Sequence, residues 1–200
     1  MRPSSPAGER SSRLRLAVPL ACLAVLTACG TSSQTARLDT PADTGPGTAT
    51  PRSAPSDVPT STAEVDVERD GLDPAVVTGV RYATHDGYDR VVIDLKGDIP
   101  GYKVKWVDEF LQDGSGEPMG VQGGAYLQLT LFPANAHDDD GYPTWKGGPV
   151  YRAGLRNVSH VVRTGDFEGR VGVGLALARR AGFRVKEQSA PSRLVLDVAH

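Results

Sequence analysis

The 200-residue chain has only two cysteines, Cys22 and Cys29, and both lie within its first thirty residues. The remainder offers no thiol for a disulfide, a thiolate metal site or a cysteine nucleophile. The usual hydrolase and phosphate-loop motifs are also missing. These absences exclude the disulfide-rich and cysteine-dependent classes, and they leave no motif for a cofactor, a metal or a catalytic residue.

An excess of basic residues is lacking as well. The chain has 22 Lys and Arg against 24 Asp and Glu. Residues 1–28 contain four arginines and one glutamate, so the rest has 18 basic and 23 acidic residues, a net charge of −5. Nucleic-acid binding needs many cations to neutralise phosphates. We therefore expect no nucleic-acid partner.

Long hydrophobic runs are absent except near the N-terminus, where residues 16–27 are almost entirely apolar. A bilayer-spanning helix needs about 20 such residues, so this stretch is too short. Arg10, Arg13 and Arg15 precede it and give it the basic flank of a secretory signal peptide. We predict that residues 1–28 are such a signal.

The apolar stretch ends in Leu26-Thr27-Ala28-Cys29-Gly30. This sequence resembles the bacterial lipobox, in which cleavage falls before a cysteine that is then acylated. The resemblance implies lipidation of Cys29 and anchoring in a lipid bilayer, because several acyl chains hold a protein firmly. Two alternatives stay open: an uncleaved anchor, or ordinary cleavage after Ala28 followed by release.

Residues 29–73 are rich in Thr, Ser, Pro and Ala and poor in large apolar side chains. Such a segment buries too little surface to offset its conformational entropy. We expect a disordered tether that holds the following domain away from the membrane.

Residues 74–200 contain short apolar stretches separated by Gly, Pro, Asn and Asp at roughly ten-residue spacing, the pattern of a β-sandwich or barrel. About 130 residues suffice for a core of this kind. Gly172 and Gly174 share one strand face, where we expect another backbone or strand to approach closely. The predicted strands are residues 76–82, 88–96, 102–110, 125–132, 158–164, 170–178, 183–188 and 193–199.

Two of these strands repeat a pattern. Residues 89–95 read DRVVIDL and residues 192–198 read SRLVLDV. In each, an arginine is followed four residues later by an aspartate on the same strand face. We expect related strands in two halves of a sandwich, paired or facing each other, with the charged residues forming exposed pairs worth about 0.2–1 kcal/mol each.

The first of these stretches, extended to residues 85–92 (HDGYDRVV), and the ending at residues 191–200 (PSRLVLDVAH) resemble the AMIN-like domain of bacterial lipoproteins. Residues 100–102 and 165–169 fit the same family, so the resemblance covers most of residues 74–200. It implies an antiparallel, all-β sandwich without catalytic residues, which binds in the cell envelope. Wall binding itself is transferred from AMIN domains by analogy.

Two polar clusters are candidate chemical sites. Residues 137–140 read HDDD, and adjacent carboxylates can bind a hard cation such as calcium. The spacing is not that of a calcium-binding loop, and we expect a solvated acidic loop. His85 lies beside Asp86, but His85-Asp86-Gly87 has the composition of a turn between two strands.

Aromatic side chains of the middle strands and of the long loop 133–149 offer a binding hypothesis, because flat rings with polar tips stack on sugars. Packing of some of these rings in the core is the alternative. The candidate ligand-binding residues are Tyr102, Trp106, Tyr142, Trp145 and Tyr151.

Together these features predict an extracytoplasmic lipoprotein on the outer face of the cell membrane, whose non-catalytic domain binds peptidoglycan or another wall component. One alternative is a protein–protein interaction or assembly module with an exposed apolar patch. Another is a wall hydrolase, which requires His85 or the acids of residues 137–140 to meet another ionisable group in a pocket.

Overall fold

The computed structural model describes residues 57–200. The predicted signal peptide, Cys29 and the tether up to residue 56 lie outside the described residues. No helix in the described part is long and apolar enough to cross a membrane.

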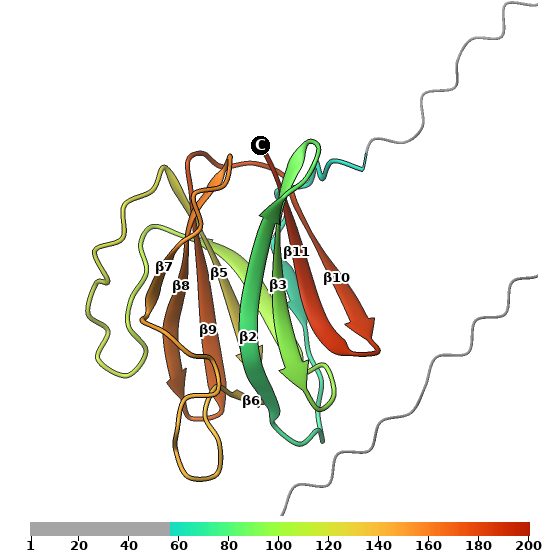
Figure 1. The fold of residues 1–200 in the computed structure, drawn as a ribbon, viewed down its shortest axis with the longest axis vertical. Coiled ribbons are helices and arrows are strands. Elements are labelled where there is room, and N and C mark those ends of the chain that lie inside the picture. Colours follow the sequence, from blue (N-terminus) through green and yellow to red (C-terminus); the bar gives the residue numbers. More distant parts are fainter. Residues whose placement is uncertain (1–56) are drawn as a thin grey trace, which may run out of the picture. The chain divides into compact units, whose positions relative to one another are not determined.

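The described residues form a β-sandwich of two sheets (Figure 1). One sheet has the strand order β1-β4-β5-β9-β8-β7 and the other has the order β10-β11-β3-β2-β6. All pairs are antiparallel except β2 with β6. The strands are β1 (Val65–Val67), β2 (Ala75–Thr84), β3 (Tyr88–Lys96), β4 (Gly101–Val107), β5 (Ala125–Phe132), β6 (Ala134–Asn135), β7 (Val150–Arg152), β8 (Val158–Phe167), β9 (Arg170–Leu177), β10 (Phe183–Ser189) and β11 (Ser192–Ala199).

The predicted fold class is confirmed, and all eight predicted strands are present with small shifts at their ends. The sequence pattern missed β1, β6 and β7, which have only two or three residues each. Stretches this short show no readable alternation of apolar and polar residues.

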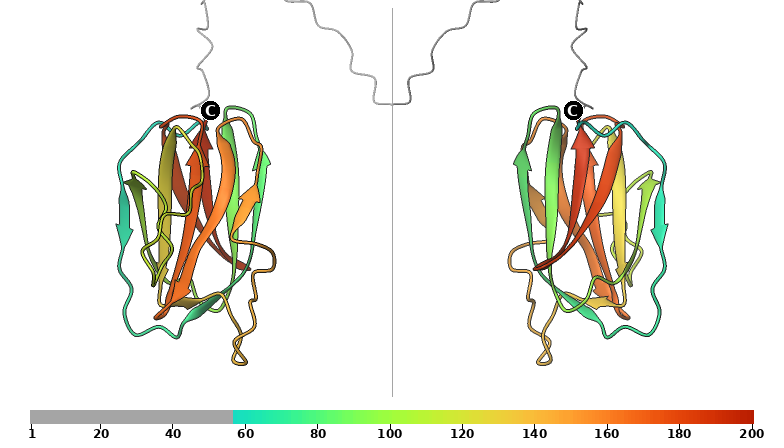
Figure 2. Two further views of the ribbon diagram at one scale, coloured as in Figure 1. Left: turned by 90° about the vertical axis from the view of Figure 1, so that its left-hand side faces the viewer. Right: turned by 90° about the vertical axis from the view of Figure 1, so that its right-hand side faces the viewer.

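Residues 57–73, which we expected to be disordered, lie against the sandwich instead. β1 pairs with β4 at the edge of its sheet, where Figure 2 shows it in teal. Val65 and Val67 pack against the core, and the backbone N–H of Phe183 donates to the carbonyl of Ser61. Two valines in alternation and a few backbone hydrogen bonds are enough to order this segment once a sheet edge is available.

The core lies between the inner faces of the sheets, where alternate residues of β3, β5 and β9, such as Val91, Leu129 and Val173, are buried. A second, smaller apolar cluster lies on the outer side of the six-stranded sheet, where Phe110 from the loop 108–124 packs on the sheet. A Cβ at Gly174 would stand 2.6 Å from the Phe110 ring. A close approach is therefore present at this glycine, but a side-chain ring makes it rather than the backbone or strand that we expected, and the loop covers this end of the sheet.

The two repeated strands are β3 and β11, and they are neighbours in one sheet. Arg90 lies directly opposite Asp197, and Arg193 lies directly opposite Asp94. The expected pairing of the strands is thus correct, although both lie in one sheet. The expected exposure is wrong for Asp197, whose side chain is 0% exposed. Arg90 on β3 and the cations Arg184 and Lys186 on β10 cover the Asp197 carboxylate. A pattern within one strand does not reveal such contacts with neighbouring strands.

Asp89, at the start of β3, joins the two sheets. Its side chain is fully buried on the core face. Oδ2 accepts hydrogen bonds from the backbone N–H groups of Asn157 (2.6 Å) and Val158 (2.9 Å), at the start of β8 in the other sheet. Oδ1 accepts a third from the Thr84 hydroxyl at 3.0 Å.

Asn157 extends this connection. Its side-chain amide donates to the carbonyl of Ala199 at 2.8 Å, and its side-chain oxygen accepts from the backbone N–H of Arg179 at 3.1 Å. Ala199 ends β11 in one sheet, and Arg179 follows β9 in the other sheet. Buried polar groups are stable only when they are satisfied in this way.

We expect the substitution Asp89→Ala to lower the free energy of unfolding by about 3 kcal/mol or more, because it leaves two buried backbone N–H groups without an acceptor. Asp94→Ala, on the same strand, is the matched control. It removes a solvent-accessible pair with Arg81 and should cost less than about 1 kcal/mol. Urea unfolding of both variants measures the difference, and equal losses would show that Asp89 does not join the sheets.

Candidate ligand-binding groove

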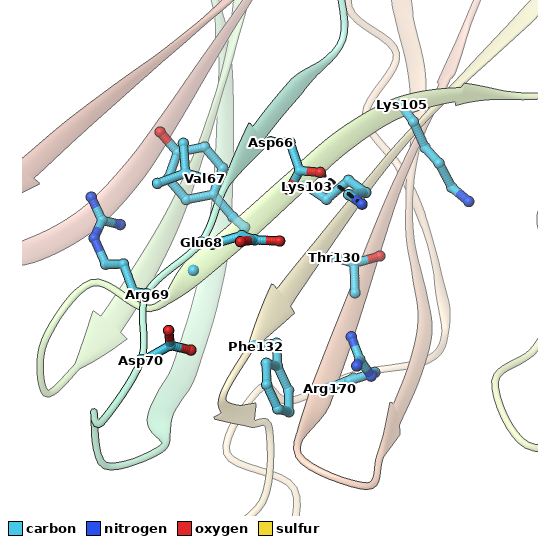
Figure 3. A pocket seen from close by; sticks show the side chains of 12 residues that line it. Asp66, Val67, Glu68, Arg69, Asp70, Lys103, Lys105, Thr130, Phe132 and Arg170 are labelled. Atoms are coloured by element: carbon cyan, nitrogen blue, oxygen red, sulfur yellow. Dashed lines mark ion pairs between the residues drawn. The ribbon is translucent and has the colours of Figure 1, made fainter.

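A groove with a volume of about 520 Å³ lies on the outer face of the six-stranded sheet. β4, β5 and β9 supply its floor, and β1 with the three residues after it supplies one wall (Figure 3). Alternation along the strands explains its composition, because Val104 and Leu131 point into the core while Lys103 and Phe132 point outward.

The floor combines an exposed ring with cations. The Phe132 side chain is 46% exposed, and the Arg170 guanidinium lies 4.4 Å from the centre of its ring. Lys103 forms an ion pair with Asp66 at 2.7 Å. Lys105, the next residue of β4 on the same face, has no ion-pair partner among residues 57–200.

One wall of the groove is held by Arg69. Its guanidinium donates to both carboxylate oxygens of Glu187 on β10 at 2.9 Å, and to the carbonyl of Pro100 at 2.9 Å. The Tyr102 hydroxyl donates to the same carboxylate at 2.9 Å. Burial and the bond to Glu187 raise the pKa of Tyr102 to about 12. Burial alone would raise the pKa of Glu187, but the hydrogen bonds from Arg69 and Tyr102 outweigh it and lower that pKa.

The groove therefore presents groups of both charge signs to a ligand. The carboxylates of Glu68 and Asp70 stand on one side, across from Phe132 and Arg170 (Figure 3). Lys105 adds an ammonium group along the floor. An elongated polar ligand with carboxylates, amines and a flat apolar face, such as a sugar ring, matches this arrangement.

The five aromatic residues singled out in the sequence do not gather at one site. Tyr102 lines the groove but is only 7% exposed, and Trp145 is 3% exposed within the core. Tyr151 stacks on Trp145 at a ring distance of 5.3 Å. Trp106 packs edge-on against Phe183 and donates its indole N–H to the carbonyl of Thr62.

Tyr142 is the most exposed of these five rings, at 66%, and it stands in the loop between β6 and β7. The carboxylate of Asp138 accepts hydrogen bonds from the backbone N–H groups of Asp140 and Tyr142 and so shapes this turn. Within residues 57–200, no group of three or more His, Cys, Asp or Glu side chains is placed to hold a metal ion.

His137 does meet another ionisable group. Its Nδ1 lies 2.6 Å from Oδ2 of Asp166 on β8, beside a second cavity of about 480 Å³. A histidine and a carboxylate form part of many hydrolytic sites, but a nucleophile or a metal-bound water is also needed. In the described part of the chain, Asp166 is the one side chain that hydrogen-bonds to His137. His85 stacks on Tyr88 in the turn between β2 and β3.

Sequence reasoning did not select Phe132, Arg170 or Lys105. One signal was available: Phe132 follows Tyr126, Gln128 and Thr130 on the face of β5 opposite its three buried leucines. A large apolar residue at the end of an otherwise polar face is a candidate contact residue. The position of Phe132 beside Arg170 depends on the pairing of β5 with β9, which the sequence pattern does not reveal.

The described residues thus form a two-sheet β-sandwich with an open groove on one outer face. The AMIN-like domain model matches residues 75–200, and the chain belongs to this family. No curated protein and no solved structure gives a significant match. AMIN-like domains are generally non-catalytic binding domains, and the family implies an extracytoplasmic location in the envelope and a cell-wall-associated binding or interaction role.

The environment of Tyr102 can be tested by spectrophotometric titration of the tyrosines in the folded protein. We expect one tyrosine to ionise near pH 12, about two units above the ordinary value, and we expect Tyr102→Phe to remove this late step. Tyr142→Phe, which alters an exposed ring that does not contact Glu187, is the control and should retain the late step. If the late step persists in Tyr102→Phe, the described bond to Glu187 is wrong.

Proposed function

We propose that the chain is a membrane-anchored lipoprotein of the bacterial envelope whose AMIN-like domain binds peptidoglycan through the groove on β4, β5 and β9. The family assignment supports an envelope-binding role. The choice of peptidoglycan depends on one observation: an exposed Phe132 flanked by groups of both charge signs. Peptidoglycan combines sugar rings with peptides that carry carboxylates and amines.

The ring and the charges have separate roles in this proposal. Phe132 offers a flat face for a sugar, and Arg170 above it keeps the ring in place. Lys105 and Arg170 attract carboxylates, while Glu68 and Asp70 attract amines. Ion pairs at such an exposed site add little affinity on their own, so the ring contributes most.

We expect Phe132→Ala to weaken sedimentation of residues 30–200 with insoluble peptidoglycan by about fivefold, which corresponds to about 1 kcal/mol of lost ring contact. Lys105→Ala should weaken it less and should reduce its dependence on salt. Tyr142→Ala is the matched control, because it removes another exposed ring that does not line the groove.

Circular dichroism of each variant separates loss of binding from loss of fold. Equal losses in the Phe132 and Tyr142 variants would contradict the groove as the site. If the unaltered chain sediments no more than an unrelated protein, peptidoglycan binding is wrong, and an interaction with envelope proteins becomes the leading function.

Anchoring makes a separate prediction. In a bacterial host, the full chain should incorporate an alkyne analogue of palmitate and fractionate with the membrane, because Cys29 follows a signal-like segment. Cys29→Ser should lose the label and leave the membrane fraction, whereas Cys22→Ser should keep both. Labelling that survives Cys29→Ser would contradict lipidation at this residue.

A further inference from the structure

The outer face of the second sheet is strongly basic. Across β10, β11, β3 and β2, outward-facing residues align in three transverse rows, which follow from the strand registers. The rows are Arg184-Asp197-Arg90-Ala83, Lys186-Val195-Val92-Arg81 and Gln188-Arg193-Asp94-Gly79. We call these twelve positions the basic face.

The basic face carries five cations and two carboxylates, a net charge of +3, although residues 57–200 as a whole have 16 basic and 21 acidic residues. The remainder of the described domain is therefore at −8. A separation of charge this large orients a protein in an electric field. The positive side is the sheet face away from the loop 108–124, as Figure 1 shows for β10 and β11.

The cations are fixed in place by the two carboxylates beneath them. Arg90 lies 2.6 Å from Asp197, Arg184 lies 3.1 Å from it and Lys186 lies 3.3 Å from it. Burial alone would raise the pKa of Asp197, but the hydrogen bonds from Arg90 and Arg184 outweigh it and lower that pKa. Asp197 therefore remains charged and holds three cations with one carboxylate.

The second carboxylate acts in the same way but at a more exposed position. Asp94 accepts two hydrogen bonds from Arg81, at 2.6 and 2.7 Å, and Arg193 stands opposite it on β11. The Nε groups of Arg184 and Arg193 have no acceptor among the described residues. Two buried donors beneath this face are thus left without a protein acceptor.

The face is also amphipathic. Val195 lies among the cations and is 3% exposed, although it belongs to neither hydrophobic cluster. The aliphatic parts of the neighbouring long side chains therefore cover it. A flat surface with apolar stems and cationic ends is suited to a planar array of anionic groups more than to a single small anion.

The chain enters the described domain at the edge of this face. The Arg184 guanidinium donates to the carbonyl and to the carboxylate of Asp57, the first described residue. Only 27 residues separate Asp57 from Cys29, and even a fully extended segment of that length reaches at most about 95 Å. Acylation at Cys29 would hold the basic face within that distance of a bilayer.

We propose that the basic face docks on the anionic phospholipid headgroups of the membrane to which the chain is tethered, with the groove turned away from that membrane. The proposal rests on the anchoring proposed above for its location. Charge complementarity supplies the attraction, and tethering raises the local concentration of headgroups, so that a small net positive charge suffices even with the Asp57 carboxylate paired to Arg184. Docking in this way would fix the orientation of the domain as well as its distance from the bilayer.

Residues 30–200 contain no cysteine, which permits a test by energy transfer. A hexahistidine tag before residue 30 attaches the chain to vesicles with a nickel-chelating lipid, so the test does not depend on Cys29. A donor dye is placed on Gln188→Cys, in the basic face, or on Glu117→Cys, in the loop on the opposite side. Rhodamine lipid is the acceptor.

On vesicles with about 30% phosphatidylglycerol, we expect higher transfer from position 188 than from position 117. The difference should disappear on phosphatidylcholine vesicles and at about 0.5 M salt, where charges are screened within a few ångströms. Neutralising Arg81, Lys186 and Arg193 together to Gln should also abolish it, because the face then has no net charge. These three leave Asp197 paired with Arg90 and Arg184.

The matched control changes Lys146, Arg152 and Arg156 to Gln, which removes the same charge from exposed positions outside the face. It should retain the difference. Equal transfer from both positions on anionic vesicles would overturn the proposal, as would a difference that survives neutralisation of the face. Binding of soluble poly(glycerol phosphate) by a chain that shows no orientation on vesicles would assign the face to a wall polyanion instead.

Discussion

The buried carboxylate of Asp89 is the centre of the polar connection between two sheets whose inner faces otherwise meet largely through apolar contact. Hydrophobic packing brings the inner faces together but does not fix how far one sheet slides over the other, because burial is non-directional. The bonds from Asp89 to the backbone of Asn157 and Val158 are directional and join β3 to the start of β8. They fix the relative position of the two outer faces, on which both proposed binding surfaces depend.

With the inner faces committed to the core, the outer faces are available for binding. The six-stranded sheet has part of its outer face covered by the loop 108–124, and the groove occupies the part between this loop and the segment after β1. Arg69 holds that segment by reaching across to Glu187 on the other sheet. The groove therefore depends on residues 57–73, although they lie outside the part that the family model matches.

The sequence predicted the elements of the fold better than their contacts. Alternation of apolar residues identified the long strands, and the repeated Arg–Asp pattern correctly indicated that β3 and β11 are related. The burial of Asp197 was missed because two of its partners, Arg184 and Lys186, come from β10, which has no such pattern. The groove was missed for a similar reason, since Phe132 and Arg170 meet only through the pairing of β5 with β9. Aromatic content was a poor guide, because Trp145 and Tyr102 are largely buried.

The opposite placement of the two surfaces limits what the domain can do. A single small ligand cannot contact both, because the thickness of the sandwich, with sheets about 10 Å apart, separates them. A planar anionic surface on one side and an extended polymer on the other can be bound at the same time. Because the basic face holds its cations over buried or half-buried carboxylates, it is formed before any ligand arrives and loses little side-chain entropy on binding. Taken together, the two proposals give the domain one role: to hold two large and separate structures of the envelope at a fixed spacing, a property that neither surface would give alone.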